Sequence, residues 1–312
     1  MNLTRGKVNI YIGIGIILAC MLALFGINRF GENVQAEEKK AQQAQQEKEK
    51  NERQAQYQQQ LEVLYGEINA LIKEKESLKS EAIGIGFYDL STKRAFSLNG
   101  DEEFLAASTS KVMLAMLVAD KIQAGELALD QQVLYTVDDY ADGTGAIINH
   151  RIETNYSIEA LLEYMLVYSD NVATNMLYRK LGGRIVIRDE FRKNYLPELN
   201  VSKNLLTANQ ARDLLIQLNE NKKKNPLYGQ IIQWLKQTEF PIRLSTDRTI
   251  EHVAHKIGSV NHSVHDIGLF DIEHPYILTF YSTGLPEAEA EISTLSDKIY
   301  QLMTESYPVL DK

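Results

Sequence analysis

Ser108 and Lys111 lie three residues apart at the start of an apolar run, and this pairing is the first sign of chemistry in the chain. The run from Val112 to Ala119 contains no polar residue, so it predicts a buried helix. One helical turn places residues i and i+3 on the same face. A hydroxyl beside an amine can act as a nucleophile with its base. Serine is also a common N-cap and lysine a common surface residue, so the pair alone favours an ordinary helix start.

The composition restricts the kind of protein and its partners. The 312 residues are enough for one large domain or two small ones with appendages. The net charge of -9 argues against a nucleic-acid partner, because nothing basic would follow a phosphate backbone. The single cysteine, Cys20, lies in an apolar run, so no disulfide can form within one chain.

The N-terminal residues have the composition of a membrane anchor. Residues Val8–Ile27 are almost wholly apolar, and Arg5 and Lys7 precede them. About 20 such residues span a bilayer as a helix, and the basic flank predicts a cytoplasmic N-terminus with an extracytoplasmic remainder. We therefore expect residues 1–31 to form a short tail and an uncleaved transmembrane helix. A cleaved signal peptide and a lipoprotein modified at Cys20 are the alternatives.

Residues 32–80 are rich in Gln, Glu, Lys and Ala and contain no proline, which predicts a helix. The later part has apolar residues at alternating spacings of three and four, interrupted once by a lysine: Leu61, Leu64, Ile68, Leu71, Lys75 and Leu78. This pattern predicts either a coiled-coil stalk that joins two copies of the chain in a homodimer or a single amphipathic helix that lies on the following domain. Both interpretations stay open at this point.

Residues 81–312 alternate between strand and helix patterns and form the expected globular domain. The predicted elements are a hairpin over 82–98, a helix from about Ser108 to Gly125, helices over 157–168, 171–182, 207–219 and 226–237, strands over 252–259, 264–272 and 276–283, and a closing helix over 287–303. Strands at both ends and helices between them predict an α/β (α+β) sandwich with an antiparallel sheet and a separate helical lobe.

Three short motifs occur in order along this domain. Ser108-x-x-Lys111 begins the first helix, Ser169-Asp-Asn171 lies between two helices, and Lys256-x-Gly258 lies on the first strand after the helical block. Together they resemble the S-x-x-K, S-D-N and K-T-G motifs of class A β-lactamases and penicillin-binding proteins. The resemblance covers about residues 81–307 and implies the β-lactamase/transpeptidase type of sandwich and a serine hydrolase.

The resemblance also implies a role for each motif residue. Ser108 would attack an acyl carbon while Lys111 takes its proton. Ser169 would relay a proton to the leaving nitrogen, and Lys256 would keep that path electropositive. Lys111 can act as a base only if its pKa falls well below about 10.4, which burial near Lys256 could achieve. Substrate-binding positions would be Asn171, Gly258 and Ser259, with the backbone N–H groups of Ser108 and Ser259 forming an oxyanion hole.

Two positions depart from the family pattern. Leu196 stands where class A β-lactamases have their deacylating glutamate, in a loop that is several residues shorter than theirs. Glu198 and Glu190 are the nearby carboxylates that could substitute for it. Ile257 stands where the family has a threonine or serine that binds the substrate carboxylate. Both departures argue against an efficient β-lactamase.

Two histidine pairs, His252-x-x-His255 and His262-x-x-His265, have a spacing found at metal sites. Residues three apart on a strand point to opposite faces, so we expect these histidines to serve the fold and predict no metal site and no cofactor. We expect Trp234, on a helix, to belong to the core.

These features predict a serine hydrolase of the penicillin-recognising type that is anchored in the cell membrane of a Gram-positive bacterium, with its domain extracytoplasmic. The expected substrate is a small molecule or a peptidoglycan-derived peptide, cleaved at an amide or ester. The acyl-enzyme at Ser108 would be released slowly, and β-lactams are candidate acylating agents. One alternative is a catalytically degenerate binding module on a coiled-coil stalk. A further alternative is a β-lactamase with a substitute base.

Overall fold

The structure is a computed structural model that describes residues 3–149 and 152–309. It contains two compact units, one made of the chain as far as Glu62 together with the residues from Pro308 onward, and one covering Val63–Tyr307. The first unit is the greater part of α1 (Leu3–Glu74), a single long helix. By length and composition alone, the helix contains a stretch near the N-terminus that is long and apolar enough to cross a membrane.

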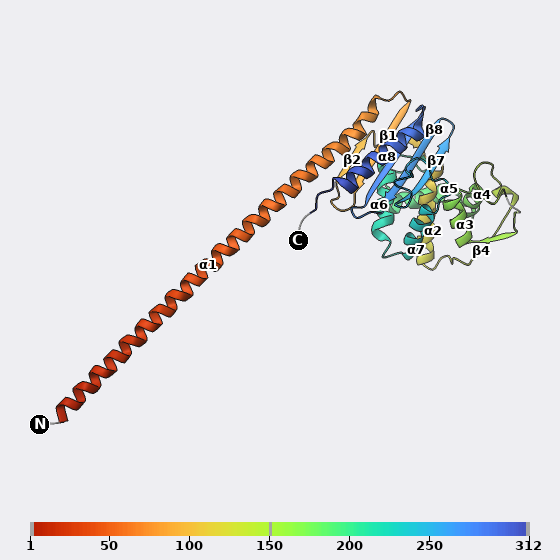
Figure 1. The fold of residues 1–312 in the computed structure, drawn as a ribbon. Helices are drawn as coiled ribbons and strands as arrows, with labels where there is room; N and C mark the ends of the chain where they lie inside the picture. Colours follow the sequence, from red (N-terminus) through yellow and green to blue (C-terminus); the bar gives the residue numbers. More distant parts are fainter. Residues whose placement is uncertain (1–2, 150–151, 310–312) are drawn as a thin grey trace. The chain divides into compact units, whose positions relative to one another are not determined.

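A five-stranded antiparallel sheet lies at the centre of the second unit (Figure 1). Its strands are arranged in the order β2-β1-β9-β8-β7, so strands from both ends of the domain pair in the middle and β7 forms one edge. The predicted hairpin and the three late strands are confirmed. The strands are β1 (Ala82–Asp89), β2 (Ala95–Leu98), β7 (Val253–Val260), β8 (Ser263–Phe270) and β9 (Tyr276–Thr283).

Helices cover both faces of this sheet, with α8 on one face and α6 on the other (Figure 1). The predicted helices are present: α2 (Lys111–Gln123), α3 (Ile158–Val167), α4 (Asn171–Lys180), α6 (Ala208–Asn221), α7 (Pro226–Lys236) and α8 (Ala288–Glu305). The α/β sandwich with an antiparallel sheet and a helical lobe is therefore confirmed.

Several short elements were not expected. They are α5 (Arg184–Asn194), the strand pairs β3 (Phe104–Leu105) with β6 (Leu205–Leu206) and β4 (Gln132–Leu134) with β5 (Asn155–Ser157), and the 3-10 helices η1 (Lys75–Ser77), η2 (Ala107–Ser110) and η3 (Val137–Asp139). Strands of two or three residues are too short to show a hydrophobic period.

Helix α2 passes through the interior of the helical lobe. Its residues from Lys111 to Ala119 are all buried, because apolar neighbours from α3, α5 and α7 surround the helix. Gly125 ends this segment in a left-handed conformation, with φ of 76°, that glycine adopts without strain. Trp234 is buried in the same core, as expected.

The domain begins earlier than the predicted boundary at residue 81, because the last turns of α1 belong to the compact unit that starts at Val63. Leu64, Ile68 and Ile72 are buried there, at 2%, 0% and 0% exposure. Lys75, the charged residue in the apolar series, pairs with Glu291 of α8 at 2.7 Å. In this part of the chain the pattern therefore corresponds to the amphipathic helix that lies on its own domain, the second of the two interpretations.

A buried carboxylate fastens this helix to the sheet. Asp89, at the end of β1, is fully buried and accepts hydrogen bonds from the hydroxyls of Tyr65 (2.7 Å) and Tyr307 (3.0 Å). The backbone N–H groups of Ser91 and Thr92 also donate to it. A buried charge needs such donors. Asp89 therefore joins α1, β1 and the C-terminal end of the domain.

Replacing Ile68 by alanine tests whether α1 is part of the domain. Because Ile68 is fully buried, we expect Ile68→Ala to lower the free energy of unfolding by about 2–5 kcal/mol. The fluorescence of Trp234, the only tryptophan, reports unfolding in urea. Val63→Ala is the control, since Val63 is 59% exposed on the same helix and should cost less than about 0.5 kcal/mol. Equal effects of the two substitutions would contradict this description.

Candidate active site

A cavity of about 510 Å³ brings together residues that are far apart in the sequence. Four of the seven predicted site residues line it: Ser108, Lys111, Asn171 and Ser259. Ser169, Lys256 and Gly258 are not among the lining residues. The sequence did not predict the remaining lining residues, which are Ala107, Ser110, Ala141, Gly143, Thr144, Thr174, Asn175, Tyr178, Arg184, Asn204 and Val260.

The sequence predicts a helix that begins at about Ser108. In the structure Ser108 lies on the short helix η2, and the α-helix begins at Lys111. Ala107 has a φ of 47°, a left-handed conformation that costs roughly 1–3 kcal/mol for a residue with a side chain. Thr109 supports the turn, donating its hydroxyl to the carbonyl of Ala106 at 2.7 Å. Ser108 is half-buried, and its hydroxyl makes no hydrogen bond within residues 3–149 and 152–309. It is therefore free to face a substrate.

The amine of Lys111 is buried and points at the Ser169–Asn171 junction. It donates to the carbonyl oxygen of Ser169 at 2.6 Å, to the hydroxyl of Ser169 at 3.2 Å and to Oδ1 of Asn171 at 2.8 Å. Burial lowers the pKa of Lys111 well below its usual value, and the positive charge of Lys256 lowers it further, although Asp170 acts in the opposite direction. A lowered pKa favours the neutral amine, which is the form that a base requires.

The junction itself is held by Asp170 and Thr144. Asp170 caps α4 by accepting from the N–H of Ala173 at 2.8 Å, and its second oxygen accepts from the N–H of Ile147 at 2.7 Å. Thr144 donates its hydroxyl to the carbonyl of Ser169 at 2.8 Å. These bonds hold Ser169 at a φ of 52°, another left-handed conformation with a cost of about 1–3 kcal/mol.

Strand β7 contributes Lys256 and Gly258. The amine of Lys256 is fully buried and has no hydrogen-bond partner among the described residues. Burial lowers its pKa to about 7, although Asp266 partly offsets the effect. A Cβ at Gly258 would lie 3.0 Å from both the carbonyl oxygen of Ala106 and the methyl of Thr109. A side chain at this position would therefore crowd η2, because the strand lies directly against it.

Ser259, the next residue on β7, has a partner that the sequence did not indicate. Its hydroxyl accepts from the guanidinium of Arg243 at 2.7 Å. Arg243 is itself buried, donates to the carbonyls of Gly258 and His265, and pairs with Glu289 at 2.9 Å. Arg243 precedes β7 in an irregular segment, so no periodic pattern pointed to it.

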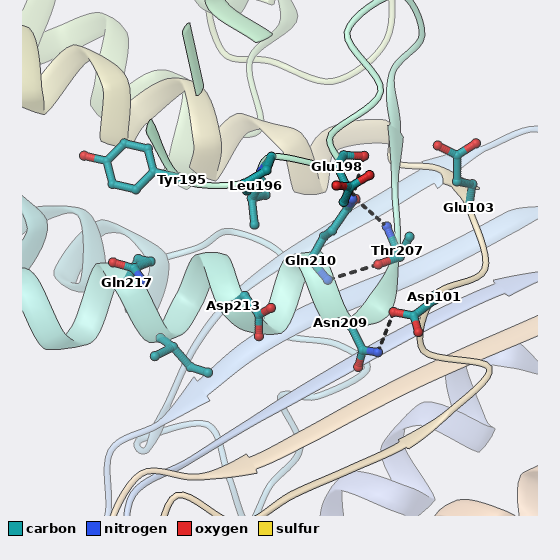
Figure 2. A pocket seen from close by; sticks show the side chains of 12 residues that line it. Asp101, Glu103, Tyr195, Leu196, Glu198, Thr207, Asn209, Gln210, Asp213 and Gln217 are labelled. Carbon is teal, nitrogen blue, oxygen red and sulfur yellow. Dashed lines mark hydrogen bonds between the residues drawn. The ribbon is translucent and has the colours of Figure 1, made fainter. Parts of the chain in front are cut away.

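The candidate carboxylates for deacylation lie outside this cavity. Leu196 and Glu198 line a second cavity of about 630 Å³ beside α6, and Figure 2 shows the Leu196 side chain directed toward that helix. Glu190 pairs with Lys121 at 2.8 Å. Among the described residues that line the Ser108 cavity, Lys111 and Arg184 are the charged ones.

One histidine of each pair makes a hydrogen bond inside the domain. Nδ1 of His255 contacts Asp266 at 2.8 Å, and Nε2 of His265 contacts the carbonyl of Leu105 at 2.9 Å. Burial lowers the pKa of His265 to about 4, so this imidazole is neutral near pH 7. No group of three or more metal-binding side chains comes together in the described part of the chain.

A sequence profile of the Beta-lactamase enzyme family matches residues 63–303. The chain belongs to this family. The match begins at the same residue as the compact unit, which agrees with the earlier domain boundary.

Individual relatives are distant. The β-lactamase VEB-1 of Pseudomonas aeruginosa is 23% identical over 248 residues, which cover 71% of this chain and 82% of that enzyme. A β-lactamase of Bacillus licheniformis is 28% identical over 170 residues, or 50% of this chain and 54% of that enzyme.

Solved structures share the fold. The structure of PBP-A superposes with a TM-score of 0.66 at 21% identity, covering 77% of this chain and 95% of that one. A leucine-to-glutamate variant of PBP-A, solved as an acyl-enzyme complex with penicillin G, superposes with a TM-score of 0.64 at 20% identity, covering 77% and 96%.

The buried amine of Lys256 makes stability depend on pH in this family member. Its pKa is about 7 in the folded chain and about 10.4 when unfolded, so between these values only the unfolded chain takes up the proton. Folding stability should therefore fall as the pH drops from about 10 to about 7, by roughly 1.4 kcal/mol per pH unit, and stay level below that.

We expect Lys256→Met to remove this dependence and to be more stable than the wild type by a few kcal/mol, as an order of magnitude, below pH 7. Urea unfolding at a series of pH values measures the difference. Lys193→Met is the control, since that side chain is 64% exposed. If the free energy of unfolding changed with pH in the same way in wild type and Lys256→Met, the conclusion that burial lowers the pKa of Lys256 would be contradicted.

Proposed function

We propose that the chain is a serine hydrolase of the penicillin-recognising type in which Ser108 forms an acyl-enzyme. The observation that carries this proposal is the buried amine of Lys111, which has a lowered pKa and contacts Ser169, beside a serine hydroxyl that is left free in a cavity. Family membership supports the same class of reaction, since the β-lactamase relatives are serine hydrolases that act on amides.

The proposed acylation begins with attack of Ser108 Oγ on the carbonyl carbon of the substrate, while the neutral amine of Lys111 takes the hydroxyl proton. The resulting oxyanion is stabilised by backbone N–H groups of Ser108 and Ser259. As the bond between carbonyl carbon and leaving nitrogen breaks, the proton passes from Lys111 through the Ser169 hydroxyl to that nitrogen. Lys256 makes this path electropositive, and Asn171 holds the amide of the acyl portion.

The same geometry supports slow release of the acyl group. Hydrolysis of the ester at Ser108 needs a base to activate water, and such a base contributes about 10²–10⁴-fold to a rate. No carboxylate is among the described residues that line the cavity, and Leu196 and Glu198 face the neighbouring one. A β-lactamase with a substitute base is therefore less well supported than a long-lived acyl-enzyme.

We further propose that residues 1–31 anchor the enzyme in a membrane with its domain outside the cytoplasm, in a Gram-positive cell. The apolar N-terminal part of α1 supports an anchor. A peptidoglycan-derived peptide, or another amide or ester of the cell wall, is the proposed substrate, and penicillin G acylates a variant of the structural relative PBP-A.

Residues 32 to about 62 would form the stalk. Leu64 and Ile68 are buried within their own domain, so they are not available to pair with a second copy of the helix. A coiled-coil homodimer would need these residues in its apolar seam. A single helix that acts as a spacer is therefore better supported than a coiled coil.

Replacing the nucleophile tests the acyl-enzyme. Incubated with benzylpenicillin, the wild-type chain should gain the mass of one penicillin, and Ser108→Ala should gain none, because that substitution removes the proposed nucleophile. Intact-mass spectrometry gives the result directly. Ser110→Ala is the control, since Ser110 lines the same cavity and its hydroxyl donates to the Ala107 carbonyl. Labelling that persists in Ser108→Ala would refute the assignment of the nucleophile.

The lifetime of the adduct separates the remaining alternatives. After free penicillin is removed, we expect the adduct to persist for minutes or longer, consistent with a release step about 10²–10⁴-fold slower than one assisted by a base. Mass spectra taken over time measure the decay. Loss within seconds would identify a β-lactamase with a substitute base. No adduct, together with no Ser108-dependent hydrolysis of an activated ester, would favour the degenerate binding module.

A further inference from the structure

The cavity at Ser108 continues past the motif residues to a second set of side chains. Beyond Asn171 it is lined by Asn175 and Tyr178 of α4, by Asn204 of the segment before β6, and by Arg184. This end of the cavity contains none of the three motifs. It offers amides, a phenol ring and one guanidinium group to whatever occupies it.

The local backbone explains how Arg184 reaches the cavity. Gly182 and Gly183 have φ values of 89° and 102°, conformations that residues with side chains rarely adopt, and they turn the chain between α4 and α5. Arg184 is the first residue of α5, and its guanidinium lies 5.1 Å from the ring centroid of Tyr178. Tyr178 is only 7% exposed, so the ring is a fixed platform for the arginine.

The charge of Arg184 is not neutralised by the protein. It forms no ion pair with a carboxylate within residues 3–149 and 152–309. Arg188, one turn later on α5, is fully buried and donates to the carbonyls of Asn200 and Leu205 and to the amide oxygen of Asn204. Arg188 also forms no ion pair with a carboxylate among the described residues. This end of the cavity is therefore cationic in a chain whose net charge is -9.

The lining also identifies which part of a substrate would lie there. Asn171 and Ser259, which are proposed to hold the acyl portion, line the cavity, whereas Ser169 and Lys256, which are proposed to serve the leaving group, do not. The extension toward Arg184 is thus continuous with the acyl side of the site.

We propose that Arg184, seated on Tyr178, forms a subsite for a carboxylate carried by the acyl portion of the substrate. The guanidinium is planar and matches a carboxylate with two parallel hydrogen bonds. The preferred substrate class is an acyl donor with an acidic side chain or terminus on the acyl side of the scissile bond. This inference rests on the proposed acylation of Ser108.

Two acyl donors that differ in one group test the subsite. Glutarylglycyl and valerylglycyl thioesters have the same chain length, and the first ends in a carboxylate where the second ends in a methyl group. The measured quantity is the second-order rate of thiol release by the full-length chain with each donor, with Ser108→Ala as the blank. We expect the wild type to prefer the glutaryl donor.

We expect Arg184→Ala to lower the ratio of the glutaryl rate to the valeryl rate by about tenfold, the usual size of a hydrogen bond to a charged group. The valeryl rate should stay within about twofold, because that donor does not use the guanidinium. Arg184→Lys should keep part of the ratio, and Arg184→Glu should reduce it further than alanine does. Lys193→Ala is the matched control, because it removes a positive charge from the same helix at an exposed position outside the cavity.

The outcomes separate this inference from the function on which it rests. If the wild type releases thiol from both donors through Ser108 and the ratio is the same in Arg184→Ala, the carboxylate subsite is refuted and the acyl-enzyme proposal stands. If Lys193→Ala lowers the ratio as much as Arg184→Ala, the preference comes from the general field of the domain, and the subsite is also refuted. If neither donor reacts with Ser108, the proposed function fails and the subsite fails with it.

Discussion

The amines of Lys111 and Lys256 are both buried, at 5% and 0% exposure, and the charge on Lys256 disfavours a proton on Lys111. Removing an ammonium group from water costs several kcal/mol even after the protein relaxes around it. The two lysines differ in how this cost is met. Lys111 is surrounded by three oxygen acceptors, whereas Lys256 has none among the described residues. The site therefore holds one buried amine with three oxygen acceptors and one with none among the described residues, and burial lowers the pKa of the second amine to about 7.

Two close approaches of the backbone make this electrostatic arrangement possible. Gly258 allows β7 to lie against η2, which brings Lys256 behind the helix that starts at Lys111. Ser169 adopts a left-handed conformation in which its carbonyl faces both Lys111 and Thr144. Such conformations persist only where surrounding contacts determine them. Here the contacts come from the sheet on one side and from the helical lobe on the other, so the site depends on the junction between the two parts of the domain.

Much of the fold was predictable from the sequence because its long elements have clear periods. The helices from α2 to α8, except α5, and four of the five strands of the sheet follow from runs of eight or more patterned residues, and the short β2 follows from the hairpin that it forms with β1. The assignment of α1 was less certain, because Leu64 and Ile68 have the same spacing whether their partner is a second helix or a sheet. Tertiary contacts such as Lys75 with Glu291 decide between these, and no local pattern contains them.

The candidate site residues also fall into those that a sequence motif contains and those that only tertiary contacts identify. Ser108, Lys111, Asn171 and Ser259 could be found because motifs carry them, and all four line one cavity. Arg243 and Thr144 could not be found, because each acts through a partner that is distant in sequence and neither lies in a periodic segment. Arg184 could not be found because it begins α5, a helix that the sequence did not predict. Gly182 and Gly183 predict only the end of a helix. Their backbone conformation also begins α5 and turns a guanidinium toward the nucleophile's cavity.

The charges around Ser108 connect the two halves of the proposed chemistry. A carboxylate placed in this cavity could activate water, but it would also raise the pKa of Lys111 and favour the protonated amine. Without one, burial and Lys256 hold Lys111 ready to accept a proton, which favours acylation, while nothing in the described lining activates water for release. The same lack of negative charge leaves Arg184 available to an acidic group on the substrate. The three proposals of ready acylation, slow release and a preference for anionic acyl donors thus rest on the same distribution of charge in the cavity.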